Sequence, residues 1–208
     1  MHKILGYGED AFTLWALKHC AADILKSFQD QTAPSNCVIF YRPSFGRSGG
    51  EKSAEFGEFD AILASSENIY LIESKWDNLS RFNKREITIR PEQRIRHHIF
   101  SWYIMHWDKK YSNSWESFVK GQMDDFRRKF PKKRIAPPDS LLAINLEFVL
   151  TMLQKRCGKF SSERNIRNVL LFFYNKKKST PPPKIGRGFN LISVDYSQEI
   201  TGNFIALY

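Results

Sequence analysis

Two carboxylates and a lysine occupy positions in this sequence from which they could hold a metal ion. Asp60 stands immediately before the apolar run 61–64, and Glu73 and Lys75 follow the apolar run 69–72. Four polar residues separate the two runs. Short apolar runs around such a separator predict two β-strands joined by a tight turn. We therefore expect a β-hairpin whose open end carries all three ionisable side chains.

The register of this hairpin decides which side chains meet. A turn centred on residues 66 and 67 places Asp60 opposite Glu73, and Glu58 opposite Lys75. Opposed residues on antiparallel strands point to the same face, with Cβ atoms about 4.5–5.5 Å apart. Glu73 and Lys75 share that face as well, because strand side chains repeat every second residue. Two opposed carboxylates destabilise a sheet unless positive charge lies between them, and a divalent cation would supply it.

The alternative is that these are ordinary solvent-facing strand residues. The run 69–72 is apolar on both faces, which is typical of a strand covered on both sides. An acid and a lysine at the end of such a strand lie at the edge of a buried sheet, where their desolvation must be offset. This favours the functional interpretation. Glu58 has two possible roles. It could form a plain ion pair with Lys75, or it could support the site as a neighbouring acid.

Length and charge limit the classes of function. The 208 residues, with a hydrophobic fraction of 42%, suffice for one well-filled domain over 1–208. The formal charge of +10 favours a polyanionic partner, of which nucleic acid is the commonest, although it also fits a merely basic protein. Three widely spaced cysteines, no signal-peptide pattern and no apolar run of about 18 residues predict a cytoplasmic protein without a membrane partner.

Periodicity predicts the elements around the hairpin. We expect the following: an amphipathic helix over 9–28, a strand at 38–41, a helix from Pro91 to Trp107 with Ile95 and Ile99 in its apolar stripe, a helical and basic insertion at about 108–165 that includes a helix from Asp139 to Lys155, a buried strand at 168–174, and short strands at 189–194 and 204–207.

This order of elements, together with Phe59-Asp60 and Glu73-Ser74-Lys75, resembles the PD-(D/E)XK nuclease superfamily. Type II restriction enzymes and archaeal Holliday-junction resolvases share its core. The resemblance covers residues 9–107 and the strand at 168–174, and Phe59 stands where the family often has proline. It implies an α/β fold with a restriction-endonuclease-like core, in which helices flank a central mixed β-sheet.

The resemblance also implies a chemistry. Asp60, Glu73 and the backbone carbonyl of Ser74 would be the ligands of Mg²⁺, for which Mn²⁺ can substitute, because hard cations prefer oxygen. Lys75 would orient the attacking water and offset negative charge. Glu9 and Gln93 occupy positions where family members carry an accessory acid and a glutamine. Their alternatives are a helix-dipole contact for Glu9 and a solvated first-turn residue for Gln93.

Basic residues are the candidates for contact with phosphates. Nine basic and three acidic residues fill the segment 109–134, which could clamp DNA or read its sequence. Such runs are also common on solvated helix faces. The second cluster follows the hairpin directly, and its members are Arg81, Lys84, Arg85, Arg90, Arg94 and Arg96.

Together these observations predict a Mg²⁺-dependent endodeoxyribonuclease that cuts double-stranded DNA and acts as a homodimer. A type II restriction enzyme ranks first, because the basic helical region could read sequence. The alternatives are a repair or junction nuclease, a DNA-binding protein of the same fold that does not cleave, and an RNA nuclease.

Overall fold

The computed structural model describes residues 4–46, 52–77, 86–107, 114–158, 165–182 and 184–207. The chain divides into two compact units. The first consists of Met1–Arg42, Phe59–Ile89 and Arg167–Tyr208, and the second of Pro43–Glu58 and Arg90–Ile166. The predicted insertion at 108–165 falls within the second unit.

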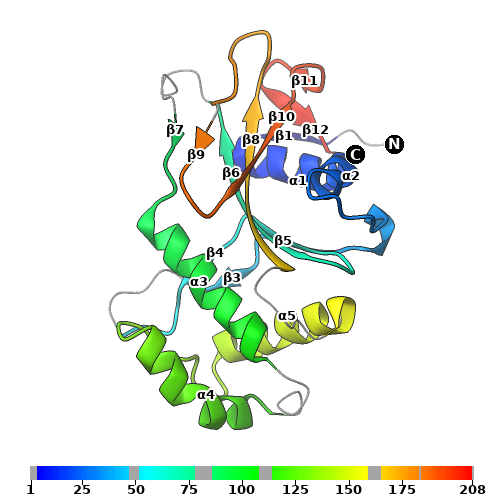
Figure 1. Cartoon of the computed structure of the whole chain (residues 1–208). Coiled ribbons are helices and arrows are strands. Elements are labelled where there is room, and N and C mark those ends of the chain that lie inside the picture. The colour runs from blue at the N-terminus through cyan, green and yellow to red at the C-terminus, as the bar shows by residue number, and fades with distance from the viewer. Residues whose placement is uncertain are drawn as a thin grey trace. The chain divides into compact units, whose positions relative to one another are not determined.

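A five-stranded mixed sheet forms the centre of the first unit (Figure 1). Antiparallel pairing joins β2 to β5 and β5 to β6, whereas β8 and β10 are parallel. This confirms the predicted α/β class with a central mixed sheet. The strands, in their order across the sheet, are β10 (Asn190–Asp195), β8 (Ile166–Tyr174), β6 (Ile69–Trp76), β5 (Ala61–Ala64) and β2 (Val38–Tyr41).

Two short helices cover one face of this sheet, where a single helix over 9–28 was expected. α1 (Glu9–His19) and α2 (Ala21–Lys26) are separated at Cys20, whose φ and ψ of −113° and 10° are not helical. The prediction of a single helix is wrong because apolar residues keep their helical spacing across the break, so the sequence pattern does not reveal it. Ile24 and Leu25 of α2 are as deeply buried as Phe12 of α1, in the same core.

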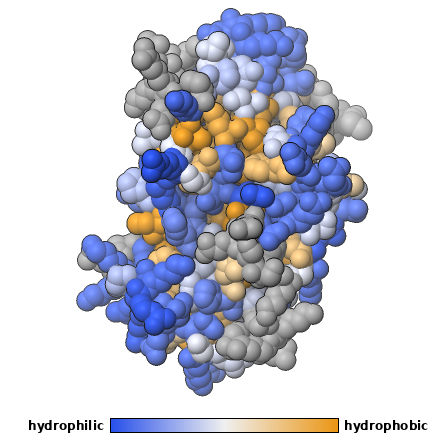
Figure 2. All heavy atoms as spheres, in the orientation of Figure 1, coloured by the Kyte–Doolittle hydropathy of each residue, from blue (hydrophilic) through white to orange (hydrophobic). Residues whose placement is uncertain are grey.

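From Val169 to Phe173, strand β8 is apolar because it contributes to a core on each face. Val169, Leu171 and Phe173 pack in the core that contains α1, whereas Leu170 and Phe172 belong to a second cluster with Ile87 and Ile89. Figure 2 shows hydrophobic side chains gathered over this opposite face, near β8 and β10.

Short strands complete the unit. β7 (Glu86–Ile87) pairs with β9 (Lys184–Ile185), and β1 (Leu5–Tyr7), β12 (Phe204–Ala206) and β11 (Ile200–Thr201) form a small sheet.

The second unit is helical and has an aromatic core. It contains β3 (Ser44–Phe45), β4 (Gly57–Glu58), α3 (Pro91–His106), α4 (Trp115–Lys129) and α5 (Leu141–Cys157). Phe45 stacks on Phe56 and Phe100, with ring centroids 5.1 and 4.8 Å away. Trp102 and Tyr103 of α3 meet Phe126 of α4. None of the helices in the described ranges is long and apolar enough to cross a membrane.

Two helix predictions in this unit need correction. Ile99 is buried as expected, but Ile95 is 48% exposed, so the apolar stripe of α3 is narrower than its period suggested. α5 begins after Ser140, not Asp139, because the Ser140 side chain accepts a hydrogen bond from the Ala143 N–H at 3.1 Å. Asp139 has a φ of 62° and lies outside the helix.

A buried aspartate fixes the turn of the β5/β6 hairpin. Asp30, 5% exposed, follows α2 and precedes a 3₁₀-helix (Pro34–Asn36). Its Oδ2 accepts hydrogen bonds from Ser65 Oγ at 2.5 Å, Asn68 Nδ2 at 3.0 Å and Tyr70 OH at 2.7 Å. Burial alone would raise the pKa of Asp30, but these hydrogen bonds outweigh it and lower the pKa to about 2.

Replacing Asp30 by alanine should therefore destabilise the fold. Three buried donors would lose their acceptor, which should lower the free energy of unfolding at pH 7 by about 2–4 kcal/mol. The folded pKa lies below the unfolded value of about 3.9, so this stabilisation is present above pH 4 and is lost as the pH falls towards 2. Urea denaturation at pH 7 and pH 2.5, followed by tryptophan fluorescence, measures both effects. Asp23→Ala on the exposed face of α2 is the control, and an equal loss in both variants would contradict this role.

Candidate active site

The hairpin that carries the candidate catalytic residues has the predicted register. Ala64 pairs with Ile69 and Ala61 pairs with Ile72, in antiparallel orientation. Asp60 is the next residue before β5, and Glu73 is the next residue along β6 after Ile72. Ala61 and Ile72 face the core with α1, so the alternation of strand side chains directs Glu73 to the opposite face, where its charge acts on Asp60.

Two backbone donors of β6 extend past the end of β5. The N–H groups of Ser74 and Trp76 point to the side of β5, since the N–H of Asp77 donates to Phe173 on the other side. Carboxylates replace the missing strand partners there. Asp60 Oδ2 accepts from the Ser74 N–H at 2.6 Å, and Glu9 Oε2 accepts from the Trp76 N–H at 3.1 Å. The sheet edge thus holds Asp60 and Glu9 in place by hydrogen bonds to main chain.

Lys75 lies between Ser74 and Trp76, the two residues whose N–H groups bind these acids. Its Nζ is 3.6 Å from Glu9 Oε1, and both side chains are about one-third exposed. The expected pairing of Lys75 with Glu58 is wrong, because the chain bends at Asp60 and Glu58 pairs with Ser44 in β3. Glu9, at the first turn of α1, is the acid that meets the lysine.

Charge crowding shifts the pKa of Asp60. Burial raises it most, and the neighbouring charge of Glu73 raises it further. The hydrogen bond from the Ser74 N–H and the Lys75 charge lower it, but the result is a pKa of about 7. Burial also raises the pKa of Glu9, against the lowering effect of Lys75. Glu73 itself is 1% exposed. Glu73 and Glu9 therefore lie close enough to Asp60 to oppose its ionisation.

Polar side chains beneath the hairpin support the site. Thr13 Oγ1 donates to Ser74 Oγ at 2.8 Å, and both residues are buried. On the same face, Trp76 Nε1 donates to Tyr196 OH at 2.9 Å, and that hydroxyl donates to Asp77 Oδ1 at 2.7 Å. Thr13 was not among the residues predicted to form the site. A polar residue four positions after Glu9, within an otherwise buried stretch of α1, is the signal that could have identified it.

The remaining predicted residues lie in the second unit or outside the described residues. Arg90, Gln93 and Arg96 line one cleft of about 480 Å³, together with Glu58, whereas Arg94 does not. Gln93 Oε1 accepts from the Arg90 N–H at 3.1 Å, which caps the start of α3. Gln93 therefore has a structural role, and a catalytic role for it stays a prediction. Arg81, Lys84 and Arg85 fall outside the described residues.

The donor set fits a hard divalent cation. Among the described residues, no three or more His, Cys, Asp or Glu side chains are grouped to hold a metal ion. The predicted ligand set needs only two, Asp60 and Glu73, with the carbonyl of Ser74, because Mg²⁺ keeps several waters. After burial, the charges of Glu73 and Glu9 raise the pKa of Asp60, and a cation near these acids would relieve that repulsion.

No family model, curated protein or solved structure matches this chain. The chemistry of the site therefore has to be inferred from its own residues.

Replacing Asp60 by asparagine should stabilise the protein in EDTA. The folded pKa of about 7 exceeds the unfolded value of about 3.9, so the free energy of unfolding falls as the pH rises from 4 to 7. Asparagine removes this charge and still offers an oxygen to the Ser74 N–H. We expect a gain of about 1–3 kcal/mol at pH 8 that nearly vanishes at pH 4.

Thermal and chemical denaturation at the two pH values test this. Asp10→Asn is a suitable control, since Asp10 lies next to Glu9 in the first turn of α1 but pairs with Arg42. If Asp60→Asn is less stable than the parent chain at pH 8, the carboxylate is an ordinary structural acceptor.

Proposed function

We propose that the protein is a Mg²⁺-dependent endodeoxyribonuclease of the PD-(D/E)XK type, first of all a type II restriction enzyme. The observation that carries the proposal is the crowding of Asp60 and Glu73 at the end of one antiparallel hairpin, next to Lys75. One acid at this strand end is enough to accept the Ser74 N–H, whereas the second buried acid, Glu73, raises the pKa of the first. The mixed sheet with α1 on one face and β8 beside β6 is compatible with the fold that the family requires.

Each residue has a role in this proposal. Asp60, Glu73 and the Ser74 carbonyl would hold the cation, which when bound neutralises phosphate charge and lowers the pKa of a water. Lys75 would orient the nucleophilic water and stabilise negative charge on the attacked phosphate. Glu9, hydrogen-bonded to Trp76 and 3.6 Å from Lys75, keeps the lysine at the sheet edge. Glu9 is thus a positioning residue in this account.

DNA as the substrate is supported by charge. The chain carries 32 Lys and Arg against 22 Asp and Glu, and phosphate contacts supply most of the non-specific affinity of such proteins. Arg90 and Arg96 line the cleft of the second unit. A repair or junction nuclease is the alternative within this class, and a DNA-binding protein that does not cleave is the alternative outside it.

Cleavage assays on catalytic variants test the proposal. Supercoiled plasmid and synthetic four-way junctions are incubated with Mg²⁺ or EDTA. Asp60→Ala and Glu73→Ala should lower cleavage by at least about a thousandfold while DNA binding persists or tightens, because each change deletes negative charge facing phosphate. Lys75→Ala should lose most turnover without losing metal affinity, and Glu9→Ala should lose less.

The products separate the alternatives. Discrete plasmid fragments indicate restriction, and cutting of junctions alone indicates a resolvase. Glu67→Ala, on the hairpin turn, is the control for general effects of removing an acid from this hairpin. Asp60→Ala protein that cuts at the parental rate, free of contaminating nuclease, would refute the catalytic assignment. No cutting by the parent chain would favour a binding protein.

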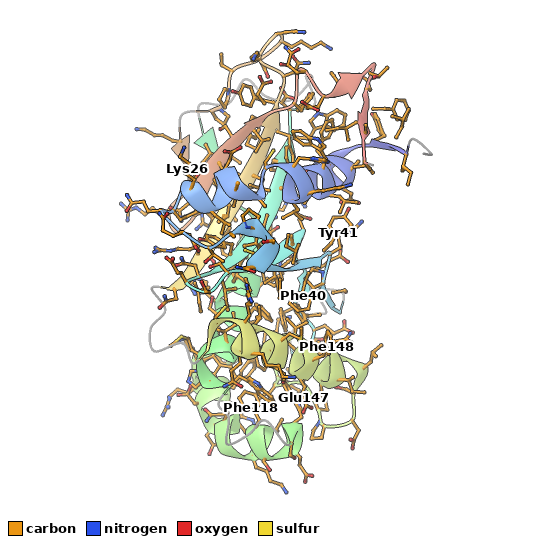
Figure 3. The ribbon with its side chains drawn as sticks, turned by 90° about the vertical axis from the view of Figure 1, so that its right-hand side faces the viewer. Lys26, Phe40, Tyr41, Phe118, Glu147 and Phe148 are labelled. Carbon is orange, nitrogen blue, oxygen red and sulfur yellow. The ribbon has the colours of Figure 1, made fainter. Side chains whose placement is uncertain are left out.

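The homodimer expected of such an enzyme would form through α5. Its exposed apolar side chains Leu141, Ile144 and Phe148 are 73%, 58% and 61% exposed and recur at intervals of three and four residues, on one helix face. Figure 3 shows Glu147 and Phe148 on this helix. The first fourteen residues of α5 contain one acid and no cation, in a chain of charge +10, so this face complements a second copy rather than a polyanion.

Phe148→Glu should therefore convert a dimer into a monomer, because an uncompensated charge would be buried at the contact. Sedimentation velocity measures the change. Ile95→Glu is the matched control, since Ile95 is a 48% exposed apolar residue on α3 of the same unit. A parent chain that sediments as a monomer, or a Phe148→Glu variant that stays dimeric, would contradict the α5 interface.

A further inference from the structure

The second unit contains a hollow that the proposed catalytic site does not use. It has a volume of about 470 Å³ and lies between α4 and the segment 134–138. This volume is in the range of about 300–1,000 Å³ that small-ligand pockets occupy. Five of its seven lining residues are apolar, and the full set is Val119, Met123, Ile135, Pro137, Pro138, Arg127 and Arg134.

The walls of the hollow are held by buried hydrogen bonds. Ala136, which is fully buried, donates its N–H to Tyr103 OH at 3.2 Å and accepts from Trp115 Nε1 at 2.9 Å through its carbonyl. These bonds anchor the backbone between Ile135 and Pro137. The two prolines that follow have fixed φ angles, so this wall has little freedom to collapse. The hollow is preformed by main chain and not by chance side-chain positions.

Two arginines give the hollow a net positive charge. Neither Arg127 nor Arg134 has a carboxylate within ion-pair distance among the described residues, and no acidic side chain lines the hollow. The neighbouring Arg128 differs, because its Nη2 is 2.6 Å from Asp125 Oδ1. An apolar cavity with two unneutralised guanidinium groups suits a ligand that joins an apolar ring to an anion.

The surrounding surface indicates which anionic ligand this is. Hydrophilic side chains cover α4 in Figure 2, and the exposed Lys129 and Lys132 extend the positive charge beyond the hollow. A chain of phosphates complements such an extended surface better than a single carboxylate does. Nucleotides combine a planar, weakly polar base with phosphates on either side.

We propose that this hollow binds one unstacked nucleotide of DNA, with its base between Met123 and Pro138 and its phosphates on Arg127 and Arg134. The choice of DNA rests on the proposed function. Apart from the arginines, the lining offers no side-chain hydrogen-bond donor or acceptor, so the base is accepted by shape and not by sequence. The hollow therefore takes unpaired nucleotides, such as those of a junction or an overhang, directly, whereas a nucleotide of continuous duplex enters it only after leaving the stack.

Binding measured without cleavage tests this. Oligonucleotides carry 2-aminopurine in a single-stranded overhang or within a duplex, and EDTA is present. No aromatic side chain lines the hollow, so a base that leaves the stack and enters it should gain fluorescence. We expect overhang DNA to bind at least tenfold more tightly than duplex of equal length, with the fluorescence gain only in the overhang.

Charge-matched double variants separate the hollow from general attraction. Arg127→Gln/Arg134→Gln should lose at least tenfold in overhang affinity together with the fluorescence gain. Lys120→Gln/Arg128→Gln removes the same charge from α4, at residues that are ion-paired to Glu116 and Asp125, and should lose less than threefold. A 5-iodouracil base in the overhang should cross-link to Met123 under ultraviolet light. Circular dichroism confirms that each variant folds.

Several results would overturn the proposal. Equal losses in both double variants would mean that Arg127 and Arg134 act only through general electrostatic attraction. Equal affinity for overhang and duplex would contradict the preference for unpaired DNA. Suppose instead that a peptide of alternating leucine and glutamate binds and is lost only in Arg127→Gln/Arg134→Gln, while DNA binding is unchanged. The occupant would then be a protein segment.

The outcome is independent of the catalytic proposal. Overhang binding with a fluorescence gain, but no Mg²⁺-dependent cleavage, would leave the hollow as a nucleotide site and refute the nuclease. Cleavage that requires Asp60 but does not change when Arg127 and Arg134 are replaced would support the nuclease and refute the nucleotide site.

Discussion

The need to satisfy two main-chain donors governs the candidate active site. Strand β6 extends beyond β5, so the N–H groups of Ser74 and Trp76 have no strand partner on that side. Asp60 and Glu9 supply the acceptors, one from the residue before β5 and the other from the first turn of α1. A buried donor without an acceptor would cost roughly 1–3 kcal/mol, which is why the sheet retains acids at this point.

This arrangement brings acids together that repel one another. Glu73 is almost completely buried, and its charge and that of Glu9 raise the pKa of Asp60. Hydrogen bonds elsewhere in the unit offset the destabilisation that this repulsion causes. Asp30 closes the hairpin turn through three side-chain hydrogen bonds, and Thr13 fixes Ser74 from α1. A rigid frame around a crowded set of charges is typical of functional sites. Such sites keep charged residues that the reaction needs, although these residues lower the stability of the fold.

The sequence was sufficient for the hairpin because its information is local. The polar turn at 65–68 sets the register, and the alternation of side chains then assigns Asp60 and Glu73 to one face. Glu58 could not be placed in this way, since its pairing with Ser44 depends on a bend at Asp60 that no local pattern encodes. The same holds for the break at Cys20, where apolar periodicity persists although the backbone changes direction.

Partners distant in sequence were also beyond reach. No residue near Asp30 in the sequence indicates that Tyr70, forty residues later, donates a hydrogen bond to it. The capping role of Gln93 was missed for a different reason. Arg90 is not a usual N-cap residue, so the hydrogen bond from its N–H to Gln93 Oε1 was not expected from residue type alone. The two arginines of the hollow looked like the rest of a basic run, and only the fold distinguishes Arg127 from its ion-paired neighbour Arg128.

The position of β6 within the sheet has a consequence for the order in which the protein is made. β6 lies between β5 and β8, and Asp77, the residue after β6, donates its N–H to Phe173 while its carboxylate accepts from Tyr196. During synthesis, the strand that carries Glu73 and Lys75 therefore has an open edge until β8 has left the ribosome. Asp60 and Glu9 precede β6 in the chain, so they can meet the Ser74 and Trp76 N–H groups before then. The site of a nascent chain is therefore supported on one edge of β6 only, until most of the chain has been made.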